Sequence, residues 1–382
     1  MSRSISSIGD GIALIALVLY VKGIEHSGVA VGALLVASAL PHLVGPLMGT
    51  LVDRLDLKRL MVACELSQAI IFSAIALWQP PFIGLLVLVA AASLLDTTFS
   101  PASGSAVPAL VGSSDLMQAN AWLGTSLNLQ VAVGPLLGGA LAAGIGPRWA
   151  LAANALSFAI SAALLTGLPK TLRVAARSSA GVLSDGLAGL RFAWRHPSIR
   201  SLMLGTFLVV AFVAVDNVAL VFLARDVLGL NAFGFGAVAA AFGVGMLAGS
   251  VVLSWIRRVP RSAPLLLVGW FLSGLSSLAT ALAPNPGVAA GAQSLGGLAN
   301  GVENVASATL IQERVPREML GRVIGLFGTS ASAGSALAYI LAGVLLDLTS
   351  PRVTFIVGGL GALAVLVVIG PILWRAAPRR TI

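Results

Sequence analysis

The chain repeats itself at a constant offset of 204 positions over most of its length. With this offset Gly32 falls on Gly236, and the pair 147–148 falls on the identical Pro-Arg pair at 351–352. The offset does not drift, so each half has the same order and length of elements. That is the signature of a duplicated architecture.

Long apolar runs fill both halves. Of the 382 residues 58% are apolar and 10% are charged, against about 25% charged in soluble domains. Helix-spanning runs of about 20 residues lie at 5–21, 28–51, 60–78, 82–107, 117–143, 149–168, 199–223, 234–255, 264–282, 288–312, 322–346 and 353–374. We expect an all-α membrane protein with twelve transmembrane helices in two parallel six-helix repeats.

The first run has a competing interpretation, because a short apolar run behind Arg3 could be a cleaved signal peptide. It contains Asp10, however, and it matches 199–223 under the repeat. We therefore expect a retained helix.

Basic residues predict the topology. With both termini in the cytoplasm, all of the 23 Lys and Arg residues face that side except Lys22, Arg148, Arg225 and Arg352. This is the positive-inside bias. We therefore expect a multi-pass protein of the plasma (inner) membrane, and we assign the net charge of +9 to topology and not to nucleic-acid binding.

We expect three parts: an N-terminal six-helix bundle at 1–168, a cytoplasmic linker at 169–198, and a C-terminal six-helix bundle at 199–382. Within the linker, Leu187, Leu190 and Trp194 recur at helical spacing, which predicts an amphipathic helix on the membrane surface. Its role is either that of a tether or that of a regulatory, partner-binding segment.

A charged motif follows the second run. Its sequence is Gly-Thr-Leu-Val-Asp-Arg-Leu-Asp-Leu-Lys-Arg-Leu-Met at 49–61, and it resembles the loop between the second and third helices of major facilitator proteins. The resemblance implies a conformational lock in which Asp53 faces the start of the helix at 322–346. The lock residues would be Gly49, Asp53, Arg54, Lys58 and Arg59. Asp56 and Leu57 depart from the family pattern, and a merely solvated loop is the alternative.

A second stretch resembles the fifth-helix motif of the family's antiporters and comprises Gly134, Pro135, Gly138 and Gly139. A proline removes one helix hydrogen bond and glycines allow close packing, so we expect a helix bend there. Ala121 and Gln130 replace glycines of that motif, which leaves ordinary small-residue packing as the alternative. Further stretches, such as 191–197 and 312–316, resemble the exporters of drugs, siderophores and macrolides in this family.

Four acids lie well inside apolar runs: Asp10, Asp96, Asp216 and Glu303. Each lies on the first helix of a three-helix unit, and the resemblance implies that these helices line a central cavity. An ionised acid at mid-bilayer costs about 3 kcal/mol, so such residues should face a wet cavity or carry a proton. The alternative is that some only hydrogen-bond between helices.

Other polar residues could line the same cavity: His42, Asn128, Gln130, Asn217, Asn300 and Asn304. His42 could instead be a hydrogen-bonded packing residue, and Glu65 is expected to pair with Arg59. Since we count no Lys or Arg inside the spans, the cavity should be negative and favour cationic or neutral amphipathic substrates.

The resemblance implies a monomeric secondary exporter of a small-molecule substrate that works by alternating access, with proton antiport through the acids. One departure is that no Arg lies between Arg59 and Arg148, where many proton-driven relatives have one in the fourth helix. The alternatives are an importer of a small nutrient and a non-transporting or lipid-handling protein of the same fold. No nucleotide loop, nucleophile motif or His/Cys metal spacing occurs in the sequence, so we expect neither an enzyme nor a cofactor or metal.

Overall fold

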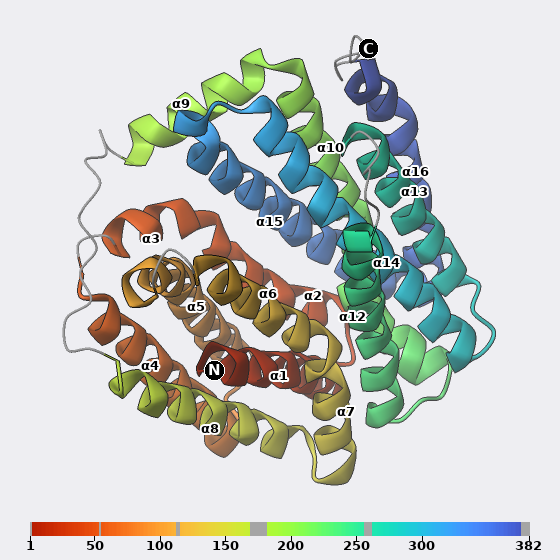
Figure 1. Ribbon diagram of the computed structural model, residues 1–382. Helices are drawn as coiled ribbons and strands as arrows, with labels where there is room; N and C mark the ends of the chain where they lie inside the picture. Colours follow the sequence, from red (N-terminus) through yellow and green to blue (C-terminus); the bar gives the residue numbers. More distant parts are fainter. Residues whose placement is uncertain (1, 53–54, 112–114, 169–181, 256–261, 376–382) are drawn as a thin grey trace. The chain divides into compact units, whose positions relative to one another are not determined.

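The computed structural model describes residues 2–52, 55–111, 115–168, 182–255 and 262–375. Across these ranges the chain forms helices and no β-strand (Figure 1). The expected all-α architecture is therefore confirmed for the described residues.

The chain folds into two compact units. The first unit comprises Met1–His26, Ala33–Ser179 and Leu230–Ala240, and the second comprises Ser27–Gly32, Ala180–Gly229 and Ala241–Ile382. The helices of the first unit are α1 (Ser2–Glu25), α3 (Gly45–Val52), α4 (Leu57–Trp78), α5 (Phe82–Leu110), α6 (Leu116–Ala132), α7 (Gly134–Gly144) and α8 (Pro147–Thr166). Those of the second are α9 (Val182–Arg195), α10 (Pro197–Val213), α11 (Asp216–Phe222), α13 (Ser262–Ala281), α14 (Pro286–Arg314), α15 (Arg317–Leu348) and α16 (Pro351–Arg375).

Two helices begin in one unit and continue in the other. Helix α2 (Gly28–Ala39) starts in the second unit and continues in the first, whereas α12 (Ala232–Trp255) does the reverse. The two helices correspond to each other under the offset of 204 residues. In both repeats, therefore, the second helix begins in one unit and continues in the other.

In the first unit, α1 packs against α6, α7 and α8, and α4 packs against α5 and α8 (Figure 1). Glycines permit this packing. A Cβ atom on Gly11 would collide with the backbone of Gln130 and Gly134, so the α1 backbone touches the break between α6 and α7 directly. Close approach through small residues is how helices associate where water does not drive them together.

In the second unit, α13 packs between α14 and α16, and α10 packs against α15 and α16. Trp270, which is 1% exposed, lies in the core of this unit with Leu266 and Ile199. Its ring covers Gly205, where a Cβ atom would collide with the indole. A large ring and a facing glycine therefore pack together within this core.

Three helix breaks position polar residues. Pro41 lies in the short 3₁₀ segment η1 (Leu40–Val44) between α2 and α3. Helix α6 ends before Val133 and α7 begins with Gly134 and Pro135, and α10 ends at Val213, three residues before α11 begins. Proline cannot donate a helix hydrogen bond, which accounts for the first two breaks. The first break places His42 in η1, and the third places Asp216 at the start of α11.

Ten described helical segments are long and apolar enough to cross a membrane by length and composition. The other two expected runs are also helical. Gly28–Val44 is shorter, and α14 contains the polar residues Gln293, Asn300 and Glu303. By this criterion ten of the twelve expected spans are supported.

Candidate functional site

The four intramembrane acids lie on four different helices. Asp10 is on α1 and Asp96 on α5, in the first unit. Asp216 is the first residue of α11 and Glu303 is on α14, in the second unit. Each unit therefore holds two of them.

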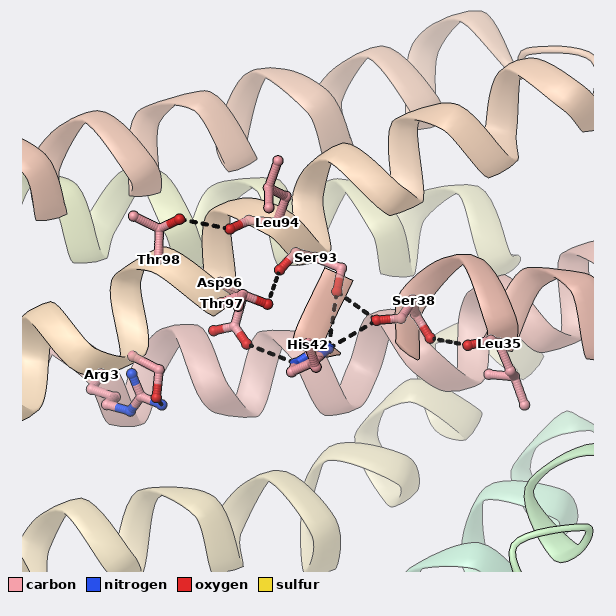
Figure 2. Close-up of polar contacts among 10 residues, drawn as sticks. Arg3, Leu35, Ser38, His42, Ser93, Leu94, Asp96, Thr97 and Thr98 are labelled. Atoms are coloured by element: carbon pink, nitrogen blue, oxygen red, sulfur yellow. Dashed lines mark hydrogen bonds and ion pairs between the residues drawn. The ribbon is translucent and has the colours of Figure 1, made fainter. Parts of the chain in front are cut away.

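Asp96 faces His42. The Asp96 Oδ2 atom lies 3.7 Å from His42 Nε2, and the two side chains are 40% and 44% exposed. Figure 2 shows the imidazole between Asp96 and the end of α2. Two residues predicted separately for the site thus form one acid–imidazole pair.

Serines hold the imidazole from its other side. His42 Nδ1 lies 3.0 Å from the carbonyl oxygen of Ser38, and Ser93 Oγ lies 3.3 Å from the same nitrogen (Figure 2). Ser93 also donates to the Ser38 carbonyl over 2.5 Å. These bonds connect α5 to the end of α2 and orient the histidine.

A cation lies near this pair, at the start of α1 and before the predicted apolar run at 5–21. Arg3 belongs to α1, donates to Ser100 of α5 over 3.4 Å, and lies 5.4 Å from the ring centroid of Phe99. Phe99 and Ser100 are about one helical turn beyond Asp96. Arg3 is also close enough to Asp10 for their charges to interact.

Glu65 occupies a different environment from the expected one. It is 1% exposed, lies close to Ser6 and Ser161, and its nearest cation is Arg3. Within the described residues no ion pair joins it to Arg59, whose side chain is exposed. Its Oε2 atom is buried with no hydrogen-bond partner among those residues, as are Asn154 Nδ2 and Ser161 Oγ.

Asp216 has a neutral partner. Gln293 of α14 donates to Asp216 Oδ1 over 3.0 Å and is itself 2% exposed. The amide also reaches Thr280 Oγ1 at 3.4 Å. No charged side chain of the described residues lies close enough to Asp216 to affect it.

Glu303 is arranged in the same way. Ser273 of α13 donates to Glu303 Oε1 over 2.7 Å and is 4% exposed. Gly269 leaves room for the carboxylate chain, because a Cβ atom there would collide with Glu303 Cγ. No charged group of the described chain affects Glu303.

The remaining predicted polar residues are on the same elements. Asn128 and Gln130 are half-buried on α6, and Asn217 is exposed and donates to the Ala214 carbonyl over 3.4 Å. Asn304 donates to Asn300 over 3.0 Å within α14. These two asparagines lie on either side of Glu303 in the sequence.

Sequence reasoning missed Gln293, Ser273, Ser93 and Arg3. For Gln293 a signal existed, because it is an amide inside a stretch of Ala and Gly. Serines are frequent in such helices, and nothing in the sequence separates Ser273 from its neighbours. Arg3 lies only one residue inside α1 and was assigned to the cytoplasmic side.

The charged motif is described in part. Asp53 and Arg54 lie outside the described residues, so the expected lock is not described, and Gly49 lies in α3. Asp56 caps α4 by accepting a bond from the Arg59 amide over 3.1 Å. Lys58 donates to the carbonyls of Thr166 and Leu168 over 2.6 and 2.5 Å. Here Lys58 satisfies carbonyls at the end of α8.

The glycine-proline stretch lies at the break between α6 and α7. Gly134 faces the backbone of Gly11, and Gly138 faces that of Ile12. Gly139 faces Gly236 of α12. Backbone atoms meet backbone atoms at all three positions, so this stretch packs two helices at once.

The chain resembles known proteins along nearly its whole length. A family model described as Major Facilitator Superfamily matches residues 1–261 and, in a second overlapping match, residues 202–381. The uncharacterized MFS-type transporter YfiS of Bacillus subtilis (strain 168) is 27% identical over 373 residues, covering 94% of this chain and 88% of the relative.

The enterobactin exporter EntS of Citrobacter koseri is also 27% identical, over 384 residues that cover 98% of this chain and 89% of the exporter. Among solved structures, the nucleoside transporter NupG aligns with a TM-score of 0.80 and 14% identity, covering 97% of this chain and 98% of that chain. At such low identity the structural match shows the fold alone. All of these matches span both repeats.

Proposed function

This chain belongs to the major facilitator superfamily and is a multi-pass membrane transporter, not an enzyme, and from that premise we propose that it exports small amphipathic compounds, cationic or neutral, in exchange for protons. It works by alternating access, with the halves 1–168 and 199–382 moving about a site at mid-membrane depth. It acts as a monomer in the plasma (inner) membrane. Both termini are cytoplasmic, which the distribution of Lys and Arg favours.

The observation that carries the proposal is the pair of acids in the second unit. Among the described residues, Asp216 receives a hydrogen bond from a neutral amide and Glu303 receives one from a hydroxyl, and no cation of those residues lies close to either acid. A purely structural acid inside a membrane protein usually has a cationic partner. Acids with neutral partners instead leave a negative charge for a transported cation or proton.

The first unit supports the proton step. His42 and Asp96 form a pair in which an imidazole, which titrates near neutral pH when unperturbed, lies beside a carboxylate. Such a pair can accept or release one proton without creating an isolated charge in the membrane. We assign proton binding to this pair, with Asp10 as a further acid of the same unit.

The relatives support export as the direction of transport. One is named as an enterobactin exporter and covers both repeats of this chain. The glycine-proline stretch and the stretches at 191–197 and 312–316 resemble exporters as well. We therefore favour export over the import of a small nutrient.

The test is transport of a fluorescent cation in proteoliposomes under an imposed pH gradient. We compare the wild type with Asp216→Asn and Glu303→Gln, and with Glu25→Gln as a control for an exposed acid at the end of α1. We expect gradient-driven transport in the wild type and the control, and a loss of at least about tenfold in both site variants. If the transport rate depends neither on the pH gradient nor on the two substitutions, proton antiport through these acids is ruled out.

A further inference from the structure

The two repeats contain equivalent helix crossings made of glycine backbone. A Cβ atom on Gly32 of α2 would meet the Tyr339 carbonyl at 2.5 Å and the Gly343 Cα at 3.5 Å on α15. In the other repeat, a Cβ atom on Gly236 of α12 would meet the Pro135 carbonyl and, at 2.9 Å, the Gly139 Cα. All of these positions correspond under the offset of 204 residues. The duplication has preserved both crossings.

Each crossing lies inside one compact unit. Ser27–Gly32, at the start of α2, belongs to the unit of α15, and Leu230–Ala240, around the start of α12, belongs to the unit of α7. The start of each helix thus belongs to the unit that holds the opposite repeat. In a transporter with alternating access, these starts are the segments that must part when their end of the protein opens.

Among the described contacts, a carboxylate bonds the start of the helix at one of the two crossings. Asp347 on α15 accepts bonds from Ser27 Oγ at 2.7 Å, from the Gly28 amide at 2.5 Å and from the Val29 amide at 3.2 Å. The two amides are first-turn donors of α2, which have no partner inside the helix. A negative charge at a helix start is also favoured by the helix dipole.

The equivalent crossing lacks this arrangement. Asp347 corresponds to Ala143, and Ser27 corresponds to Asn231. Asn231 caps its own helix, because its Oδ1 atom accepts a bond from the Gly234 amide at 2.9 Å. Helix α12 therefore keeps this side-chain cap whether or not it touches α7.

The consequence for opening is different at the two crossings. If α12 moved away from α7, the described contacts that would be lost are those between backbone atoms at Gly236 and Gly139. If α2 moved away from α15, the Asp347 carboxylate and three donors would lose their bonds together. Hydrogen bonds to an ionised group are stronger than those between neutral groups, so among the described contacts of the two crossings the strong polar ones are those between α2 and α15.

We propose that Asp347 is a latch residue that holds the start of α2 against α15 in one state of the transport cycle and releases it in the other, an inference that rests on the alternating access proposed above. The predicted topology puts this end of both helices outside, since Lys22 and Arg352 flank them there. The latch closes the outer side. It is the counterpart, at the opposite ends of the same two helices, of the lock expected from Asp53.

The test measures the opening of the outer side directly. Spin labels are attached to Trp78→Cys and Leu282→Cys, which are 72% and 71% exposed at the ends of α4 and α13, in a Cys64→Ser background. Distances are measured by double electron–electron resonance in nanodiscs. We expect Asp347→Ala to raise the ratio of long to short distances about tenfold, which corresponds to about 1.4 kcal/mol.

Two further variants make the result specific. Ser27→Ala removes one of the three donors and keeps the carboxylate, so we expect a smaller shift in the same direction. Glu25→Ala removes an exposed acid close by in the sequence, and we expect no shift. If Asp347→Ala does not fold, the latch is judged from Ser27→Ala: a shift toward long distances supports it, and an unchanged distribution refutes it.

An unchanged distribution in Asp347→Ala, or an equal shift in Glu25→Ala, would overturn the latch. The same samples are assayed for cation transport, which separates the two proposals. If the wild type transports the cation and the distance distribution of Asp347→Ala is unchanged, the proposed function stands and the latch is refuted. A wild type that does not transport refutes the function, while the distances still show whether Asp347 holds the two helices together.

Discussion

The Nε2 atom of His42 lies 3.7 Å from the Asp96 carboxylate, while Nδ1 of the same ring lies 3.0 Å from the Ser38 carbonyl. A carbonyl only accepts hydrogen bonds, so the Nδ1 atom must carry a proton to bond with it. The exchangeable proton of the imidazole is then the one on Nε2. That nitrogen faces Asp96, so protonation of the ring and the charge of the carboxylate are linked by geometry.

We predict from this pair that His42→Gln changes the pH dependence of transport. Glutamine retains hydrogen-bonding capacity but does not titrate, so the initial rate measured from about pH 5.5 to about pH 8.5 should vary less than in the wild type. Asp10, Glu65 and Arg3 remain as neighbouring charged groups. The measurement is proteoliposome uptake at fixed membrane potential.

A double-mutant cycle checks that the two residues act together. We expect the double variant His42→Gln and Asp96→Asn to transport about as fast as the slower single variant, because either change breaks the same pair. Independent multiplicative losses would contradict the pairing. Normal pH dependence in His42→Gln would remove the histidine from the proton step.

The crossing of α12 and α14 gives a stability prediction. A Cβ atom on Gly297 would collide with the Phe242 carbonyl, whereas Gly291 on the same helix has nothing within 4 Å. We expect Gly297→Ala to destabilise the protein by about 1–3 kcal/mol. Gly291→Ala is the matched control and should be neutral or stabilising by up to about 1 kcal/mol, since alanine favours helix. Thermal unfolding in detergent measures both, and equal midpoints would contradict the packing.

Lys58 gives a second stability prediction, independent of transport chemistry. Its ammonium group donates to the carbonyls of Thr166 and Leu168 and so joins the start of α4 to the end of α8. Lys58→Met keeps the apolar stem and loses the donor, and we expect a loss of about 1 kcal/mol at this partly exposed site. Arg59→Met is the control, because that side chain is exposed. A larger loss in the control would mean that the two bonds to carbonyls contribute little.

Much of the fold could be predicted because a membrane imposes it. Apolar runs of fixed length and the constant offset of the repeat predict helices and their order, and the all-α fold is confirmed. Breaks inside helices are harder to place. A proline marks η1 and the start of α7, but the break before Asp216 has no proline, and its position depends on packing.

The acids of the site could also be predicted, since a charge inside an apolar run is conspicuous. Their partners could not. Whether His42 meets Asp96 depends on how α2 ends against α5, and whether Gln293 meets Asp216 depends on the register between α11 and α14. Both are set by long-range packing that one sequence does not encode as a local pattern.

The last prediction separates a site residue from a packing residue on one helix. Ser273 and Ser276 are both buried on α13 and both donate to α14 over 2.7 Å, but Ser273 bonds the Glu303 carboxylate and Ser276 bonds the Ala292 backbone carbonyl. Both changes to alanine remove one buried hydrogen bond and should lower the free energy of unfolding by about 1–3 kcal/mol. Only Ser273→Ala leaves a carboxylate without its donor, so only this variant should alter the KM for the fluorescent cation and the pH profile of transport. Cation uptake at several pH values, alongside thermal unfolding, tests this. If the two variants affect transport equally, the hydroxyl at 273 has no role beyond packing, and the assignment of Glu303 to the site loses its structural support.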